Sequence, residues 1–411
     1  MKRLIGFVLV LGIAFSAYAQ SGEDKKAIKS IAKDVKTLSD DKMNGRETGT
    51  PGEAMAADYI AGRMEKLGLT PYGIGGYFQS FTFTPRPNPH AENVVTESMP
   101  ITGKNVIGYI DNGAVHTVVI GAHYDHLGTG AEGSLHTGEK AVHNGADDNA
   151  SGVAAVLELA RMLKDAEGLK QNNYLFIAFS GEEKGLWGSK SFVKNPTVPL
   201  ANINYMINMD MVGRLDSNKL AVNAVGTSSK WTKALDAANT NKLELVKGES
   251  GIGPSDHTSF YLEGIPALHF FTGQHSDYHK PSDDFEKVNI EGVKQVSDLI
   301  YRVIADVKKE GKLDYQKTKS EENETPRFKV TLGVMPDYMF QGQGMKIDGV
   351  IPDRPAEKAG LERGDIVIKM GDVEIKDMQS YMEGLSQFEN GQKAKVIVKR
   401  DSEQIEVEVE F

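Results

Sequence analysis

The sequence predicts an α/β fold in which helices sandwich a mixed, mostly parallel sheet, followed by a small β-rich domain. Three observations predict it. Strand-like and helix-like segments alternate between residues 105 and 307, and four of the strand-like segments are almost entirely apolar. After a polar stretch, short alternating strands continue to the end of the chain. Continuous apolar strands are typical of a sheet buried on both faces, and strand–helix alternation is typical of parallel βαβ units.

The first 19 residues have the pattern of an export signal. Lys2 and Arg3 precede an apolar run, residues 4–15, that is too short for a typical membrane-spanning helix, and Ala17-Tyr18-Ala19 fits a small-x-small cleavage site. We therefore expect an exported protein, periplasmic or secreted, with no stable membrane anchor after cleavage. An uncleaved anchor is the alternative. The chain has no Cys, which excludes disulfides and a thiol nucleophile.

The elements follow in order. Residues 20–43 are charged and helix-prone, residues 44–52 are turn-rich, and residues 53–67 have helical spacing that ends at Gly68. The apolar strands are expected at 115–122, 174–179, 203–209 and 265–271, with helices at 151–163 and 288–307. The predicted domains are 20–310 and 327–411, joined by a Lys/Glu-rich linker at 311–326.

Composition limits the classes of function. The 411 residues are 40% hydrophobic and 25% charged, which suits two or three globular domains. The formal net charge is −10 and no Lys- or Arg-rich tract occurs. The sequence therefore gives no electrostatic support for nucleic-acid binding.

Five polar clusters follow the predicted strands or the loops after them. In open α/β sheets, ligands bind at the carboxyl ends of the strands. The clusters offer only imidazole and carboxylate ligands, a set that suits Zn²⁺, Mn²⁺ or Co²⁺. They are His123-Tyr124-Asp125, Asp147-Asp148-Asn149, Glu182-Glu183, Asp210 and His279.

In two of these clusters, neighbouring residues could have different roles. His123 and Asp125 lie two residues apart, so in an extended chain the carboxylate could orient the imidazole. Glu182 and Glu183 would repel each other at a buried strand end unless a cation lay nearby, and one could bind a metal while the other accepts a proton from water. Structural alternatives are a solvated His–Asp pair, helix capping by Asp148 or its neighbours, and a solvated helix start at Glu182-Glu183.

The motifs resemble peptidase family M28, the zinc aminopeptidases. The resemblance is specific in order and spacing and rests on residues 121–128, 145–152, 180–189 and 278–279, with residues 44–52 similar to an N-terminal segment of the family. It implies that Asp147 bridges two Zn²⁺ ions, with Mn²⁺ or Co²⁺ as other suitable metals. It also implies that His123 and Asp210 complete one metal site and that Glu183 and His279 complete the other.

The same resemblance implies roles for the remaining residues. Glu182 would be the general base and acid, Asp125 would orient His123, and Tyr278 would help to polarise the scissile carbonyl. Ser255, Asp256 and His257 would lie near the specificity pocket.

The C-terminal segment resembles a PDZ domain of the bacterial protease-associated type. Residues 350–361 and 364–367 carry this resemblance, and Leu332, Gly333 and Val334 fall where a peptide-carboxylate loop would lie. A peptide or protein tail would then add as a strand to an exposed sheet edge. The alternative is a structural appendage with a blocked groove.

The expected function is that of an exported di-zinc exopeptidase that removes N-terminal residues from peptides. Two rivals remain: a glutaminyl-peptide cyclotransferase, which shares the fold and uses one zinc, and a non-catalytic scaffold whose PDZ segment binds partner tails. The sequence does not separate an aminopeptidase from a dipeptidase or carboxypeptidase.

Overall fold

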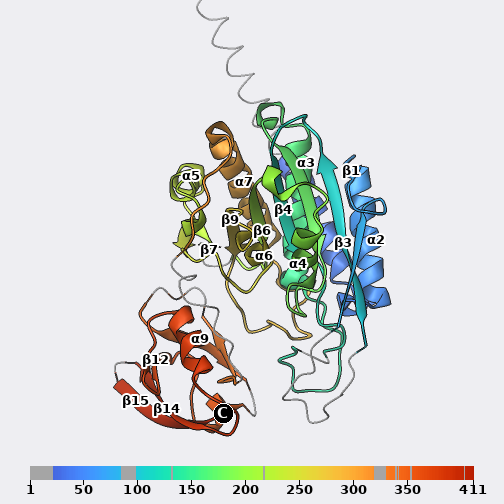
Figure 1. Ribbon diagram of the computed structural model, residues 1–411. Coiled ribbons are helices and arrows are strands. Elements are labelled where there is room, and N and C mark those ends of the chain that lie inside the picture. Colours follow the sequence, from blue (N-terminus) through green and yellow to red (C-terminus); the bar gives the residue numbers. More distant parts are fainter. Residues whose placement is uncertain are drawn as a thin grey trace, which may run out of the picture.

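A computed structural model describes residues 22–84, 99–130, 133–215, 218–318, 330–337, 340, 342–351, 354–401 and 403–411 (Figure 1). The expected export signal and residues 319–326 of the expected linker lie outside these ranges. None of the helices in the described ranges combines the length and apolar character needed to cross a membrane.

The first domain contains a nine-stranded mixed sheet in the order β1-β3-β5-β4-β6-β9-β7-β8, with β2 also paired to β3. The central strands β5, β4, β6 and β9 are parallel, and β3 and β7 flank them in antiparallel orientation. The predicted mixed sheet is confirmed. The strands β1 to β9 span Thr70–Pro71, Phe78–Phe83, Ile101–Ile110, Thr117–His123, Asn173–Phe179, Ile203–Met209, Lys219–Asn223, Glu244–Lys247 and Ala267–Phe271.

Helices cover both faces of this sheet, as the sequence predicts (Figure 1). Side chains alternate along β4: Val118 and Ile120 join the larger core, whereas Val119 joins the smaller core on the opposite face. The larger core packs against the helix at residues 22–38 and against α2, α3, α5 and α7, which span Pro51–Lys66, Gly152–Lys164, Trp231–Ala238 and Ile290–Val307. The smaller core includes Phe192 of α4 and Phe260 of α6, helices that span Trp187–Lys194 and His257–Tyr261.

Residues 311–318, the described part of the expected linker, pack against the first domain. Leu313 belongs to the larger core. The Asp314 carboxylate accepts hydrogen bonds from the hydroxyls of Ser228 and Ser229, each at 2.9 Å. The Thr318 backbone N–H donates to the Tyr261 hydroxyl at 2.8 Å. This part of the chain is therefore fixed to the domain that precedes it.

The second domain is a six-stranded antiparallel sheet in the order β10-β11-β12-β14-β15, with β13 paired to β12. Its core is separate from those of the first domain and contains residues such as Leu332, Ile347 and Val396. The strands β10 to β15 span Val334–Pro336, Met345–Val350, Ile366–Met370, Val373–Glu374, Lys393–Arg400 and Glu403–Glu410, and the helices α8 and α9 span Pro355–Lys358 and Met378–Ser386.

Candidate active site

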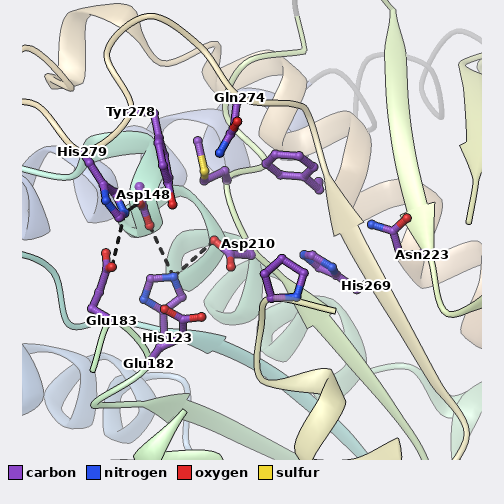
Figure 2. A pocket seen from close by; sticks show the side chains of 13 residues that line it. His123, Asp148, Glu182, Glu183, Asp210, Asn223, His269, Gln274, Tyr278 and His279 are labelled. Atoms are coloured by element: carbon purple, nitrogen blue, oxygen red, sulfur yellow. Dashed lines mark hydrogen bonds and ion pairs between the residues drawn. The ribbon is translucent and has the colours of Figure 1, made fainter. Parts of the chain in front are cut away.

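A cavity of about 110 Å³ opens where the parallel strands of the first domain end. His123 is the last residue of β4, and Glu182 and Asp210 follow β5 and β6. Tyr278 and His279 reach the cavity from the loop after β9 (Figure 2). The sheet thus brings together residues that are more than 150 positions apart in the sequence (123 and 279), at the sheet edge expected from its topology.

The ligand-type side chains form two groups that share one carboxylate. His123, Asp148 and Asp210 make the first group, and His126, Asp148 and Glu183 make the second. His123 Nε2 lies 3.2 Å from Asp210 Oδ1 and 3.4 Å from Asp148 Oδ1. Within each group the ligand atoms lie within 4.8 Å of one another. Asp148 therefore lies where one carboxylate could serve two cations.

His279 faces the second group (Figure 2). Its Nε2 lies 3.2 Å from Glu183 Oε2 and 3.3 Å from Asp148 Oδ2. Among the described residues, no Lys or Arg lies within ion-pair distance of Asp148, Glu183 or Asp210. Clustered, largely buried carboxylates with only imidazole neighbours require added positive charge, so the donor set fits divalent cations such as Zn²⁺.

The geometry puts Asp148, and not the predicted Asp147, in the shared position. The Asp147 Oδ1 atom accepts hydrogen bonds from the Gly213 N–H at 2.6 Å and the Ser151 hydroxyl at 2.9 Å, and Oδ2 lies 3.2 Å from His275 Nε2. The backbone here is not helical, with φ and ψ of −104° and 91° at Asp148, so no periodic pattern in the sequence indicates which of the two carboxylates takes the shared position. The two neighbouring carboxylates consequently point to different surroundings.

His126 is a site residue to which the sequence analysis gave no role. Its Nδ1 lies 2.8 Å from Glu183 Oε1, so that His126 and His279 flank the two oxygens of this carboxylate. The available signal was its place in the His-Tyr-Asp-His run at 123–126, but no regular strand or helix period places the fourth residue of that run beside Glu183.

Glu182 and Glu183 occupy different electrostatic surroundings. Burial, together with nearby Asp210 and Glu183, raises the pKa of Glu182 well above its ordinary value despite the opposing effect of His123. Burial also acts to raise the pKa of Glu183, but His279 and His126 outweigh it and bring the pKa to about 2. Neighbouring carboxyl groups whose pKa values diverge in this way are typical of an acid–base residue beside a permanently charged one.

Asp125 is completely buried next to His123. Its Oδ1 lies 3.7 Å from His123 Nδ1 and accepts a hydrogen bond from the Glu182 backbone N–H at 3.2 Å. The Thr48 hydroxyl donates to its Oδ2 at 2.9 Å. This carboxylate therefore links the imidazole of the first group to the backbone of Glu182.

Arg46 joins the loops that carry the site residues. Its guanidinium is completely buried and donates to the carbonyl oxygens of Tyr124 at 2.7 Å, Asn144 at 2.7 Å and Gly145 at 3.0 Å, and also to that of Leu38. Tyr124 lies between two site residues, and Gly145 lies three residues before Asp148. A single side chain thus fixes both loops to the N-terminal helix.

The remaining predicted residues lie around the cavity. The Tyr278 ring stacks on His279, with centroids 3.8 Å apart. Ser255, Asp256 and His257 are buried behind the cavity wall, to which Pro254 contributes instead. The far wall, which no motif in the sequence indicates, consists of Met211, Asn223, Pro254, His269, Phe271 and Gln274.

The predicted peptide loop of the second domain precedes an edge strand. Leu332 is buried, Gly333 has a φ of 77°, and Val334 begins β10, which among the described residues pairs only with β11. The Leu332 and Gly333 carbonyls accept hydrogen bonds from the N–H groups of Ala356 and Ile351, at 2.8 and 2.9 Å. The loop is therefore held in place, and within the described chain no strand pairs with the other edge of β10.

Comparisons with known proteins match one family to each of the two domains. Residues 105–304 match the model of peptidase family M28, and residues 316–411 match that of the PDZ domain. Aminopeptidase YwaD of Bacillus subtilis is 34% identical over 185 residues, 41% of this chain and 39% of that protein. Leupeptin-inactivating enzyme 1 of Streptomyces exfoliatus is 29% identical over 63% of this chain and 51% of that protein. The chain thus spans about half or less of these relatives.

Solved structures share the fold of the first domain. BSAP, a zinc aminopeptidase from Bacillus subtilis, aligns with a TM-score of 0.54 and 21% identity, covering 70% of this chain and 95% of that structure. The glutaminyl cyclase of Bacteroides thetaiotaomicron aligns with a TM-score of 0.55 and 19% identity, covering 68% and 97%. At these identities the likeness concerns the fold alone.

Proposed function

Residues 105–304 form a domain of peptidase family M28 and residues 316–411 form a PDZ domain, and we propose from this premise that the protein is a di-zinc aminopeptidase acting on peptides. The observation that carries the proposal is the Asp148 carboxylate, shared by two groups of ligand-type side chains. Relatives named as aminopeptidases support the reaction class.

The distances in the site support the proposed ligand set. Asp148 would bind both ions, His123 and Asp210 would complete one site, and Glu183 and His279 would complete the other. His126 would hold the Glu183 carboxylate by its hydrogen bond. When bound, the ions would act as Lewis acids toward the scissile carbonyl and lower the pKa of the attacking water.

The chain's own groups would then move the proton and orient the substrate. Glu182, whose pKa is raised by burial, would accept a proton from the attacking water and deliver it to the nitrogen of the breaking C–N bond. Tyr278 lines the cavity and would donate a hydrogen bond to the developing oxyanion. Asp125 would keep His123 in one orientation.

We also propose that the protein is exported to the periplasm or the medium, because residues 1–19 have the pattern of a signal peptide. The second domain would bind an extended peptide or protein tail along β10, whose outer edge pairs with no strand among the described residues. The proposed partners are therefore peptides at both domains.

A metal titration with paired variants tests the proposal. We expect about two zinc ions per chain and chelator-sensitive release of p-nitroaniline from aminoacyl p-nitroanilides. Asp148→Asn should lose metal and nearly all activity, whereas Asp147→Asn, the neighbouring control, should keep most of both. Equal metal loss in the two variants would contradict the ligand assignment. One zinc per chain, with conversion of glutaminyl peptides to pyroglutamyl peptides, would instead favour a cyclotransferase.

A further inference from the structure

The cavity continues beyond the ligand cluster to a wall that combines apolar and neutral polar side chains. Met211, Pro254 and Phe271 supply the apolar part, and Asn223, His269 and Gln274 supply the polar part. Figure 2 shows His269 and Asn223 beyond Asp210 from the cluster. In an aminopeptidase of this geometry, such a wall would face the side chain of the N-terminal residue.

The sheet register fixes two of the polar groups side by side. Asn223 of β7 is the direct antiparallel partner of His269 of β9, and Ala221 is the partner of Phe271. Directly opposed residues project from the same face of a sheet, as do residues two apart in a strand. The pair Asn223 and His269 is thus part of the rigid sheet and not of a mobile loop.

Several atoms of this wall have unmet hydrogen-bonding capacity. Within the described chain, both ring nitrogens of His269 and the Oε1 atom of Gln274 are buried and have no hydrogen-bond partner. His269 is only 3% exposed. Behind it the His257 ring stacks at a centroid distance of 4.5 Å, and its nitrogens also lack described partners. Buried polar atoms are rarely left unpaired, so the His269 and Gln274 atoms that line the cavity point to a ligand that would pair with them.

The wall also carries no formal charge of its own. The carboxylates that line the cavity, those of Asp148, Glu182, Glu183 and Asp210, belong to the ligand end, and no Lys or Arg of the described chain lines the cavity. An acidic side chain would meet no cation at the wall, and a basic side chain would meet no carboxylate there. An apolar side chain would leave the His269 and Gln274 atoms unpaired.

From this placement we infer that the enzyme prefers substrates whose N-terminal residue carries a neutral side chain that both donates and accepts hydrogen bonds, with a carboxamide as the best match. His269 would supply one ring nitrogen as donor or acceptor, Gln274 Oε1 an acceptor, and Asn223 an amide. The inference rests on the proposed aminopeptidase function, because it assigns that site's specificity.

Isosteric substrates test it. We compare kcat/KM for Asn, Leu and Asp p-nitroanilides, and for the Gln, Met and Glu series. The wild-type enzyme should prefer Asn to Leu, and Gln to Met, by at least about ten-fold, because a site built for hydrogen bonds rejects analogues that lack them. Asn223→Leu and His269→Phe should each reduce that ratio. Lys219→Leu, at the exposed start of the same strand, should leave it unchanged.

A binding measurement separates this inference from the proposed function. Calorimetric titration of free asparagine, leucine and aspartate into the zinc-loaded Glu182→Gln variant reports side-chain preference without turnover. Tighter binding of asparagine would support the inference even if no p-nitroanilide were cleaved. Absence of cleavage would reject only the aminopeptidase activity. The inference would be overturned if leucine bound as tightly as asparagine or more tightly, or if the leucine substrate were turned over as well as the asparagine substrate or better. Mass analysis of glutaminyl peptide products would show whether free glutamine or a pyroglutamyl peptide forms.

Discussion

Replacing Arg46 should destabilise the first domain and weaken metal binding together. The guanidinium donates to four backbone carbonyls and, within the described chain, has no carboxylate at ion-pair distance. Burial lowers its pKa, but nearby carboxylates, Asp148 foremost, oppose this effect, and the resulting value of about 10 keeps it cationic at neutral pH. Arg46→Met would preserve most of the side-chain length and remove every donor.

The magnitude follows from the number of hydrogen bonds. A buried acceptor that loses its donor costs about 1–3 kcal/mol, so four carbonyls give a gross cost of about 4–12 kcal/mol. Removing the need to bury a cation offsets part of this, and we expect a net loss of about 3–5 kcal/mol in the free energy of unfolding. Arg46→Lys should fall between the wild type and Met, because a single ammonium cannot reproduce the planar set of donors.

Urea unfolding, monitored by tryptophan fluorescence, measures the loss in the free energy of unfolding of the first domain. The only two Trp residues, Trp187 and Trp231, lie in the first domain, so their emission is independent of unfolding in the second. Zinc affinity, measured by competition with a chelator, should fall as well, since the Arg46 hydrogen bonds hold the loops that carry His123 and Asp148.

Arg63→Met is the matched control. Arg63 forms a partly buried ion pair with Asp34, with its Nε 2.6 Å from Oδ1, and does not contact the cavity. This variant should lose stability and keep its zinc affinity. A change below about 1 kcal/mol for Arg46→Met, or equal effects of the two variants on zinc affinity, would refute the reasoning.

Glu182→Gln should fold and bind zinc but lose about 10²–10⁴-fold in kcat, since it removes only the proton acceptor; retained turnover in a p-nitroanilide assay would reject that role. In the metal-free protein, burial raises the pKa of Asp256 to about 7. The folded state therefore holds a proton that the unfolded state releases, and stability falls as pH rises from about 4 to 7. Between pH 4 and pH 8, the free energy of unfolding of Asp256→Asn should rise by roughly 4 kcal/mol relative to that of the wild type. If the urea midpoints of the two proteins changed equally between these pH values, the prediction would be contradicted. Gly333→Ala should abolish binding of a fluorescent peptide with an apolar C-terminal residue while leaving p-nitroanilide turnover intact, because the φ of 77° disfavours Ala and its Cβ would lie 2.1 Å from Arg354 Cβ; unchanged anisotropy titrations would speak against the predicted loop.

The sequence predicted the parts of the fold that depend on local periodicity. The apolar runs at β4, β5, β6 and β9 became central parallel strands, and the family resemblance was confirmed for both domains. The antiparallel strands β1 to β3 were not identified. The β3 sequence contains Gly103 and Gly108 and alternates poorly, and its strand character depends on partners distant in the chain.

The sequence indicated the loop that carries the shared carboxylate, but not which residue of that loop supplies it. Three consecutive Asx side chains marked the loop before α3, yet the choice between Asp147 and Asp148 depends on local φ and ψ values that no periodic pattern encodes. The contact of His126 with Glu183 and the hydrogen bonds of Arg46 join segments that are 57 and up to 99 residues apart. Such contacts follow from tertiary packing, which local patterns in a single sequence do not reveal.

The docking of residues 311–318 on the first domain limits how far the second domain can travel. The chain is held at Thr318 by Tyr261, and the second domain is described from Val330 onward. The residues between these points span at most about 40 Å even when fully extended. A peptide bound at β10, as proposed, would therefore remain tethered to the first domain, at an effective concentration on the order of millimolar. Weak capture by the second domain would then suffice to make cleavage of that peptide, or of another chain held with it, effectively intramolecular.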